Sequence, residues 1–137
     1  MRNVVAVLLG TMVAFGLVSI GDAIAGSMFA LPAGIDPNDR PAVTAALEAA
    51  IANAPLSAML AIVAGYFVAA LGGGFIARKI ASTTTVWPSI AVGLMVLAGT
   101  IANFAMITHP MVIVVLGVLA PLPGAWLGAR IAGTAKR

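Results

Sequence analysis

The sequence predicts an all-α integral membrane protein, a four-transmembrane-helix bundle with a short outer amphipathic helix between spans one and two. Its 137 residues are 62% hydrophobic and only 8% charged, with a mean hydropathy of +1.14. A soluble chain of this size could not bury so much apolar surface. The apolar residues also form four continuous runs of about 20 residues, the length that a helix needs to cross about 30 Å of hydrocarbon.

The four expected spans cover most of the chain. A β-barrel would show short segments of alternating polarity, whereas these runs are continuous and each is bounded by charge, proline or a polar cluster. We therefore expect a single membrane domain over residues 1–137, with an outer loop over residues 31–53. The expected spans are residues 4–25, 56–77, 86–106 and 111–131.

The positively charged residues predict how the spans are oriented. If the chain alternates across the membrane, six of its seven Lys and Arg residues lie on one side and Arg40 lies on the other. The six are Arg2, Arg78, Lys79, Arg130, Lys136 and Arg137. Cytoplasmic loops carry such an excess, so we expect a multi-pass protein of the bacterial inner (plasma) membrane with cytoplasmic N and C termini. Because these residues flank spans and form no patch, we expect membrane lipid and not nucleic acid as a partner.

The first span has a second interpretation. Arg2, the apolar run and Ala23-Ile24-Ala25 together resemble a secretory signal with a small-residue cleavage site. The run is long for the apolar region of a signal, so we expect a retained helix.

The second half of the outer loop predicts a short amphipathic helix. Asp39 can cap this helix, and its first turn tolerates Pro41. Apolar residues then recur on one face at helical spacing, as in a helix that lies on a membrane surface. They are Val43, Leu47, Ile51 and Ala54. A simple connector is the first interpretation, and a lid over a cavity or a docking surface for a partner is the alternative.

Small residues recur at every fourth position in three spans. In lipid the hydrophobic effect does not drive helix association, so small-xxx-small patterns matter because they let helix backbones approach closely. The expected packing positions are Gly10 and Ala14 in span one, Ala61, Gly65, Ala69 and Gly73 in span two, and Gly124 and Gly128 in span four. These positions can serve packing within the chain, or contact with a second copy or a larger membrane complex.

Span four carries Pro121 and Pro123 near its middle. Each proline removes a helix hydrogen bond and crowds the carbonyl four residues back, here Gly117 and Leu119. Carbonyl groups freed at membrane depth must be buried in protein or line a wet cavity. We therefore expect a kinked span, with an architectural role or, alternatively, a role in transport.

Asp22 and Asn103 form the candidate polar site. Asp22 is the one acid well inside an apolar run, and an intramembrane carboxylate is costly enough to suggest a function. At 1.5 Å per residue, Asp22 lies about 27 Å above Val4 and Asn103 about 25 Å above Val86. We therefore expect both near the outer edge of the hydrocarbon. They would form a hydrogen-bonded layer at the helix ends or, alternatively, a proton or cation site open to the outside.

Catalytic and metal chemistry are not expected. There is no cysteine, no nucleophile–base pair and no phosphate-binding loop. His109, beside Met106 and Met111, has neighbours that suit Cu(I), but a single histidine gives too few strong ligands. We expect no cofactor, no metal and no enzyme activity, with His109 in a tight turn.

We therefore expect a small non-catalytic inner-membrane protein, an accessory or structural subunit that packs against itself or a larger membrane complex. The small-residue ridges, the minimal loops and the scarcity of polar groups favour this interpretation. The alternative is a small oligomeric transporter or channel with a polar site at Asp22 and Asn103. Polar groups at several depths would favour transport, whereas the sequence shows mainly one polar layer.

Overall fold

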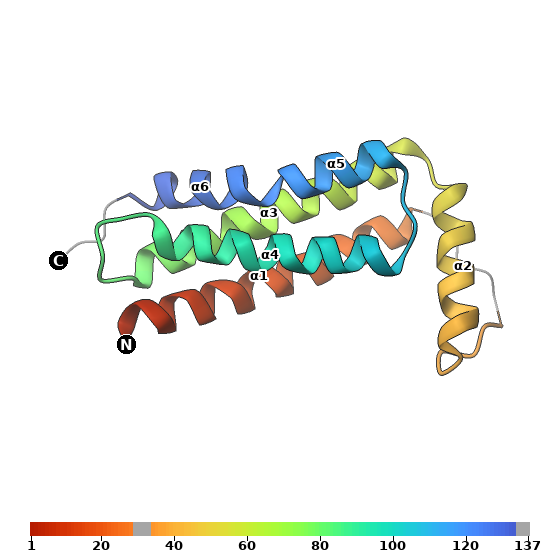
Figure 1. Ribbon diagram of the computed structural model, residues 1–137, viewed down its shortest axis with the longest axis horizontal. Coiled ribbons are helices and arrows are strands. Elements are labelled where there is room, and N and C mark those ends of the chain that lie inside the picture. Colours follow the sequence, from red (N-terminus) through yellow and green to blue (C-terminus); the bar gives the residue numbers. More distant parts are fainter. Residues whose placement is uncertain (29–33, 134–137) are drawn as a thin grey trace.

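The computed structural model describes residues 1–28 and 34–133, which form six helical segments (Figure 1). They are α1 (Arg2–Ser27), α2 (Arg40–Ala52), α3 (Leu56–Ile80), α4 (Trp87–Met106), α5 (Met111–Leu119) and α6 (Pro121–Ala132). Because α5 and α6 follow one another across Ala120, the described residues contain four helices that are long and apolar enough to cross a membrane, as predicted. Residues 31–33 of the expected loop and the basic residues Lys136 and Arg137 lie outside the described part.

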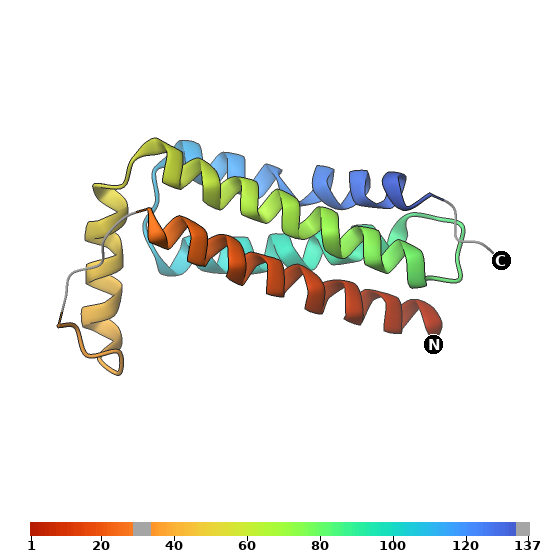
Figure 2. The ribbon, with the colours of Figure 1, turned by 180° about the vertical axis from the view of Figure 1, so that it is seen from behind.

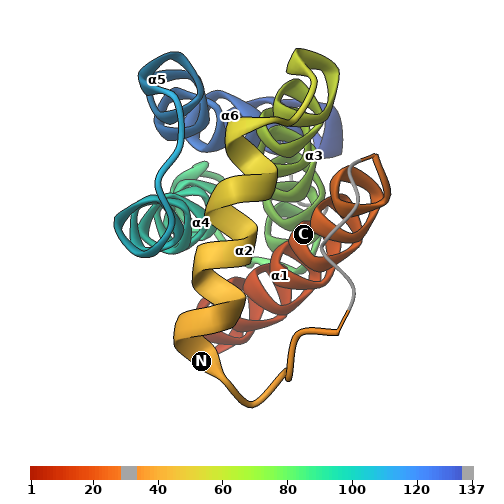
Figure 3. The same cartoon turned by 90° about the vertical axis from the view of Figure 1, so that its right-hand side faces the viewer.

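The four long helices run side by side, and α2 lies across one end of them (Figures 1 and 2). A view along the bundle shows α2 crossing in front of α1, α3 and α4 (Figure 3). The other end holds the start of α1 and the end of α6, and we call these two ends the α2 end and the terminal end. Helix α3 is the central element, since it packs against α1, α4 and α6.

Local chemistry explains several helix limits. Helices α3 and α5 begin directly after Pro55 and Pro110, where the missing amide hydrogen of proline costs little. Helix α3 continues to Ile80, beyond the expected end at residue 77, with Arg78 and Lys79 in its last turn. Cations are favourable there because they oppose the negative end of the helix dipole.

Helix α2 starts at the expected cap. The Asp39 carboxylate accepts a hydrogen bond of 3.2 Å from the Ala42 amide, and Pro41 lies in the first turn. Ile51 is buried against the bundle, together with Met59 and Ile113. Ala54, expected on the same helical face, instead follows the helix, which ends at Ala52.

Helices α1 and α3 pack closely because glycine residues, which have no side chain, lie where the two backbones meet. A Cβ atom added at Gly73 would lie 2.5 Å from the Gly10 carbonyl oxygen and 2.7 Å from the Ala14 Cβ atom. Ordinary contacts are much longer, so the two backbones touch with no room for a methyl group. Further along, the Cβ atom of an alanine at Gly65 would lie 3.6 Å from the Gly21 Cα atom. Ala69 is fully buried, whereas Ala61 is only partly buried.

A second close contact joins α3 and α6. A Cβ atom at Gly124 would lie 2.5 Å from the Phe67 carbonyl oxygen, and one at Gly128 would collide with the Leu71 carbonyl oxygen. These glycines thus pack within the chain, on a face of α3 different from the one that meets α1. The buried apolar cluster between the helices consists of Ala14, Ala70, Ala77, Val92, Val96 and Ala125.

The fourth long helix is interrupted at Ala120, next to the prolines. Helix α5 ends at Leu119 and α6 begins at Pro121, which is fully buried, whereas Pro123 is exposed. Ala120 keeps helical backbone angles, with φ −68° and ψ −40°. The helical course therefore continues from α5 into α6, and the interruption is local (Figure 1).

Arg78 organises the terminal end, a role that its sequence position does not reveal. Its side chain is only 3% exposed. The guanidinium donates hydrogen bonds of 2.7–3.1 Å to four backbone carbonyl oxygens, those of Thr83, Thr84, Thr85 and Gly133. It therefore joins the turn between α3 and α4 to the end of α6. Sequence reasoning assigns Arg78 only to the set of charges that orient the chain.

Candidate functional site

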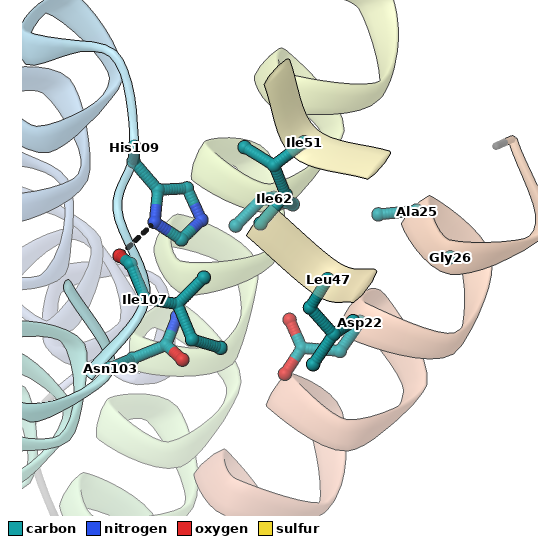
Figure 4. A pocket seen from close by; sticks show the side chains of 9 residues that line it. All are labelled: Asp22, Ala25, Gly26, Leu47, Ile51, Ile62, Asn103, Ile107 and His109. Carbon is teal, nitrogen blue, oxygen red and sulfur yellow. Dashed lines mark hydrogen bonds between the residues drawn. The ribbon is translucent and has the colours of Figure 1, made fainter. Parts of the chain in front are cut away.

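A cavity of about 340 Å³ opens at the α2 end, between α2 and the tips of the long helices (Figure 4). Its volume is in the range of small-molecule sites. Three of its lining residues are polar: Asp22, Asn103 and His109. The others are Ala25, Gly26, Leu47, Ile51, Ile62 and Ile107. The site thus combines a few polar groups with mostly apolar walls, and α1, α2, α3 and α4 all contribute to it.

Asp22 lies five residues before the end of α1, on the same side of the helix as Ala25 and Gly26. Residues three and four apart share a helical face, so all three line the cavity. Figure 4 shows the carboxylate of Asp22 directed across the cavity toward Asn103. Asp22 is exposed, and no hydrogen bond to its carboxylate is formed by residues 1–28 and 34–133. The charge is therefore available to a ligand.

The structure brings Asn103 to the same cavity as Asp22, but its hydrogen-bond partner is a residue that sequence reasoning missed. The Asn103 side-chain amide donates a 2.8 Å hydrogen bond to the hydroxyl oxygen of Tyr66. Tyr66, on α3, is only 3% exposed. It is the single tyrosine of the chain and lies inside an apolar span, a signal that could have identified it because a buried hydroxyl group needs a partner.

A second, smaller cavity of about 130 Å³ continues the site into the bundle. Asp22 and Asn103 line both cavities, and Tyr66 and Thr100 line the deeper one. The Thr100 hydroxyl donates to the Val96 carbonyl oxygen at 2.9 Å. Val96 belongs to the buried apolar cluster, so the polar lining gives way at this level to close apolar packing.

His109 is placed by two contacts. Its Nδ1 atom is 2.7 Å from the Ile107 carbonyl oxygen, and its ring meets Phe104 edge to face with centroids 4.9 Å apart. Phe104 in turn meets Tyr66 at 6.1 Å. Edge-to-face pairs of this kind fix ring orientation, so His109 is held in a defined position at the cavity wall.

The titratable groups of the site are few. Asp22 and His109 are the two titratable side chains of the larger cavity, and they come from different elements with no hydrogen bond between them. Among the residues that the structure describes, no three His, Cys, Asp or Glu side chains gather where they could hold a metal ion. What the cavity offers is one carboxylate, two fixed polar groups and apolar walls.

Comparison with known proteins finds no family model, no curated protein and no solved structure that matches this chain. The function is therefore inferred from the chemistry and the surface of the molecule.

Proposed function

We propose that this chain is a small non-catalytic protein of the bacterial inner membrane, an accessory or structural subunit that packs against a second copy or a larger membrane complex. The observation that carries the proposal is an apolar groove between α1 and α3, with a volume of about 260 Å³. Gly21 and Gly65 lie in it beside Ala61 and Ala64, and its rim is formed by larger apolar residues.

The groove has the form that a neighbouring helix requires. Three of its rim residues are exposed: Ile20 by 58%, Ile24 by 57% and Val68 by 52%. A hydrophobic helix can lie close to such a surface, because the small residues allow near approach while the larger ones interlock with the partner. The groove is made by the same helix pair whose small residues pack within the chain at Gly10 and Gly73.

The charge distribution supports a defined orientation in the membrane. Arg2, Arg78, Lys79 and Arg130 lie at the terminal end, whereas all four acidic residues of the chain and Arg40 lie toward the α2 end. The positive-inside rule then places the terminal end in the cytoplasm and α2 on the outer face. A reporter fused after Arg137 should be cytoplasmic, and a tag inserted at Asn38 should be accessible from the periplasm. A periplasmic C-terminal reporter would refute this orientation.

The partner can be tested with single cysteines, since the native chain contains none. Ile24→Cys on the groove should give a disulfide-linked dimer or a cross-link to another membrane protein in native membranes. Leu119→Cys is the matched control, because Leu119 is 63% exposed but lies on α5, away from the groove. Native mass spectrometry from nanodiscs should show the same assembly. A monomer in nanodiscs, with no cross-link at residue 24, would sink the proposal.

A second candidate function is transport by a small oligomer, and the cavity at Asp22 and Asn103 favours it. Below that cavity, α1, α3 and α4 pack closely around Val92 and Val96, so transport would require these helices to separate. Liposome flux measured with a pH-sensitive dye distinguishes the two functions. An accessory subunit gives no flux, whereas a proton or cation transporter gives flux that Asp22→Asn abolishes because the titratable charge is lost.

A further inference from the structure

We propose that the larger cavity at the α2 end binds a small organic ammonium ion, a primary amine that carries an apolar group. The geometry points to this ligand because every polar side chain that lines the cavity presents a hydrogen-bond acceptor to it, while its walls are apolar (Figure 4). The inference goes beyond the accessory role and requires neither a partner nor a particular orientation in the membrane.

Asp22 supplies the charge. Its carboxylate faces the cavity (Figure 4), and an ionised carboxylate can only accept hydrogen bonds. No lysine or arginine lines the cavity, so no permanently charged cation of the lining pairs with the carboxylate. A bound cation would provide both the missing charge and the missing donors.

Asn103 supplies the second acceptor. One N–H of its side-chain amide donates a hydrogen bond to the Tyr66 hydroxyl oxygen, which holds the amide in one orientation. In that orientation the amide oxygen is directed toward the Asp22 side of the cavity (Figure 4). Since an amide oxygen only accepts hydrogen bonds, it requires a donor from the ligand.

His109 supplies the third acceptor. The Ile107 oxygen that lies 2.7 Å from Nδ1 is a carbonyl and cannot donate, so Nδ1 carries the hydrogen. In the neutral ring the other nitrogen, Nε2, is then an acceptor, and it faces the cavity (Figure 4). The three acceptors come from three separate parts of the chain and line one cavity, and a primary ammonium group carries three N–H donors that could serve them.

The walls determine the rest of the ligand. Leu47 and Ile51 of α2, Ala25 of α1 and Ile62 of α3 all line the cavity, so a ligand in it meets aliphatic groups from three helices. A volume of about 340 Å³ leaves room for a substituent of several carbon atoms beside the ammonium group. An isolated metal ion would fill only a small part of this space and would leave the apolar walls without a role.

The charges around the cavity favour the entry of cations. All four acidic residues of the chain, Asp22, Asp36, Asp39 and Glu48, belong to the α2 end, where Arg40 is the one lysine or arginine. Glu48, which follows the lining residue Leu47, accepts hydrogen bonds from Thr108, which precedes the lining residue His109. Clefts lined by one sign of charge raise the local concentration of the opposite ion.

The test uses protein labelled with ¹³C at the δ1 methyl groups of isoleucine, in detergent micelles at neutral pH. Ile51, Ile62 and Ile107 line the cavity and report on it directly. Ile131, which is 60% exposed on α6, reports on general partitioning into the micelle. Three compounds of similar shape are titrated: 2-phenylethylamine, 2-phenylethanol and 3-phenylpropanoate.

The amine is expected to shift the methyl signals of Ile51, Ile62 and Ile107 to saturation, with little change at Ile131. The alcohol and the carboxylate should bind more weakly by roughly tenfold or more, since a hydrogen bond to a charged group is lost. Asp22→Asn should weaken amine binding by a similar factor. Asp36→Asn, which removes an acid of the same end that does not line the cavity, should leave it unchanged.

Three results would overturn the proposal. Equal binding of the three compounds would show that the carboxylate does not select the ligand. Shifts that spread to Ile131 without saturation would show partitioning into the micelle only. Zn²⁺ that saturates the same three methyl groups while the amine does not would show a metal site instead. The comparison of compounds uses wild-type protein, so it remains decisive if Asp22→Asn fails to fold, and the oligomeric state does not enter it.

Discussion

Two glycines of α1 provide a sharp test of how this bundle is held together. A Cβ atom at Gly10 would lie 2.6 Å from the Gly73 carbonyl oxygen and 2.9 Å from the Ala77 Cβ atom, whereas one at Gly16 meets nothing within 4 Å. Both residues lie inside the same helix. The substitutions Gly10→Ala and Gly16→Ala therefore add the same methyl group in the same secondary structure and differ only in what that methyl group meets.

The expected energies have opposite signs. In a helix interior alanine is more favourable than glycine by about 1 kcal/mol, so Gly16→Ala should raise the free energy of unfolding by about that amount. At Gly10 the same gain is opposed by overpacking, which typically costs about 1–3 kcal/mol. The obstacle is a backbone oxygen of α3, which cannot rotate away as a side chain can. Both variants gain the same helix propensity from alanine, so this contribution cancels when they are compared. The free energy of unfolding of Gly10→Ala should therefore be lower than that of Gly16→Ala by about 1–3 kcal/mol.

The measurement is reversible unfolding in mixed micelles with increasing dodecyl sulfate, followed by the fluorescence of Trp87 and Trp126. Both tryptophans are exposed and far in sequence from the substitutions. Circular dichroism before titration confirms that each variant has the same helix content. If Gly10→Ala is as stable as Gly16→Ala, α1 and α3 do not touch at Gly10 and Gly73, and the described packing of this helix pair is wrong.

Two further predictions concern polar groups that the bundle buries. Arg78→Met should lower the free energy of unfolding by at least about 2 kcal/mol, because hydrogen bonds to a charged group contribute about 1.5–3 kcal/mol. The control Lys79→Met should lower it by less than about 1 kcal/mol, because Lys79 is exposed. Equal losses would refute the role of Arg78. Tyr66→Phe should cost about 1 kcal/mol, since it removes the acceptor of the Asn103 amide. In a double-mutant cycle with Asn103→Ala the two losses should not add, and strict additivity in the same unfolding assay would contradict the hydrogen bond.

Much of the local structure could be predicted from the sequence because it depends on neighbours along the chain. Continuous apolar runs determine long helices, and Pro55 and Pro110 mark where two of them begin. Asp39 caps α2 because a short acidic side chain can reach an amide three residues ahead. The similar positions of Asp22 and Asn103 along their helix axes follow from the rise of about 1.5 Å per residue in an α-helix. In the structure both residues line the same cavity.

The sequence could not determine what these residues face. It determined four long apolar helices, their small-residue positions and a separation of charges, because hydropathy, glycine spacing and charge are properties of the chain itself. Only the tertiary structure decided that Gly10 meets Gly73, that Asn103 binds Tyr66, and that Arg78 joins the α3–α4 turn to the end of α6. Each of these contacts joins segments distant in sequence. The rotation of each helix about its axis decides which contacts form, and that rotation is set by the packing of all the helices together.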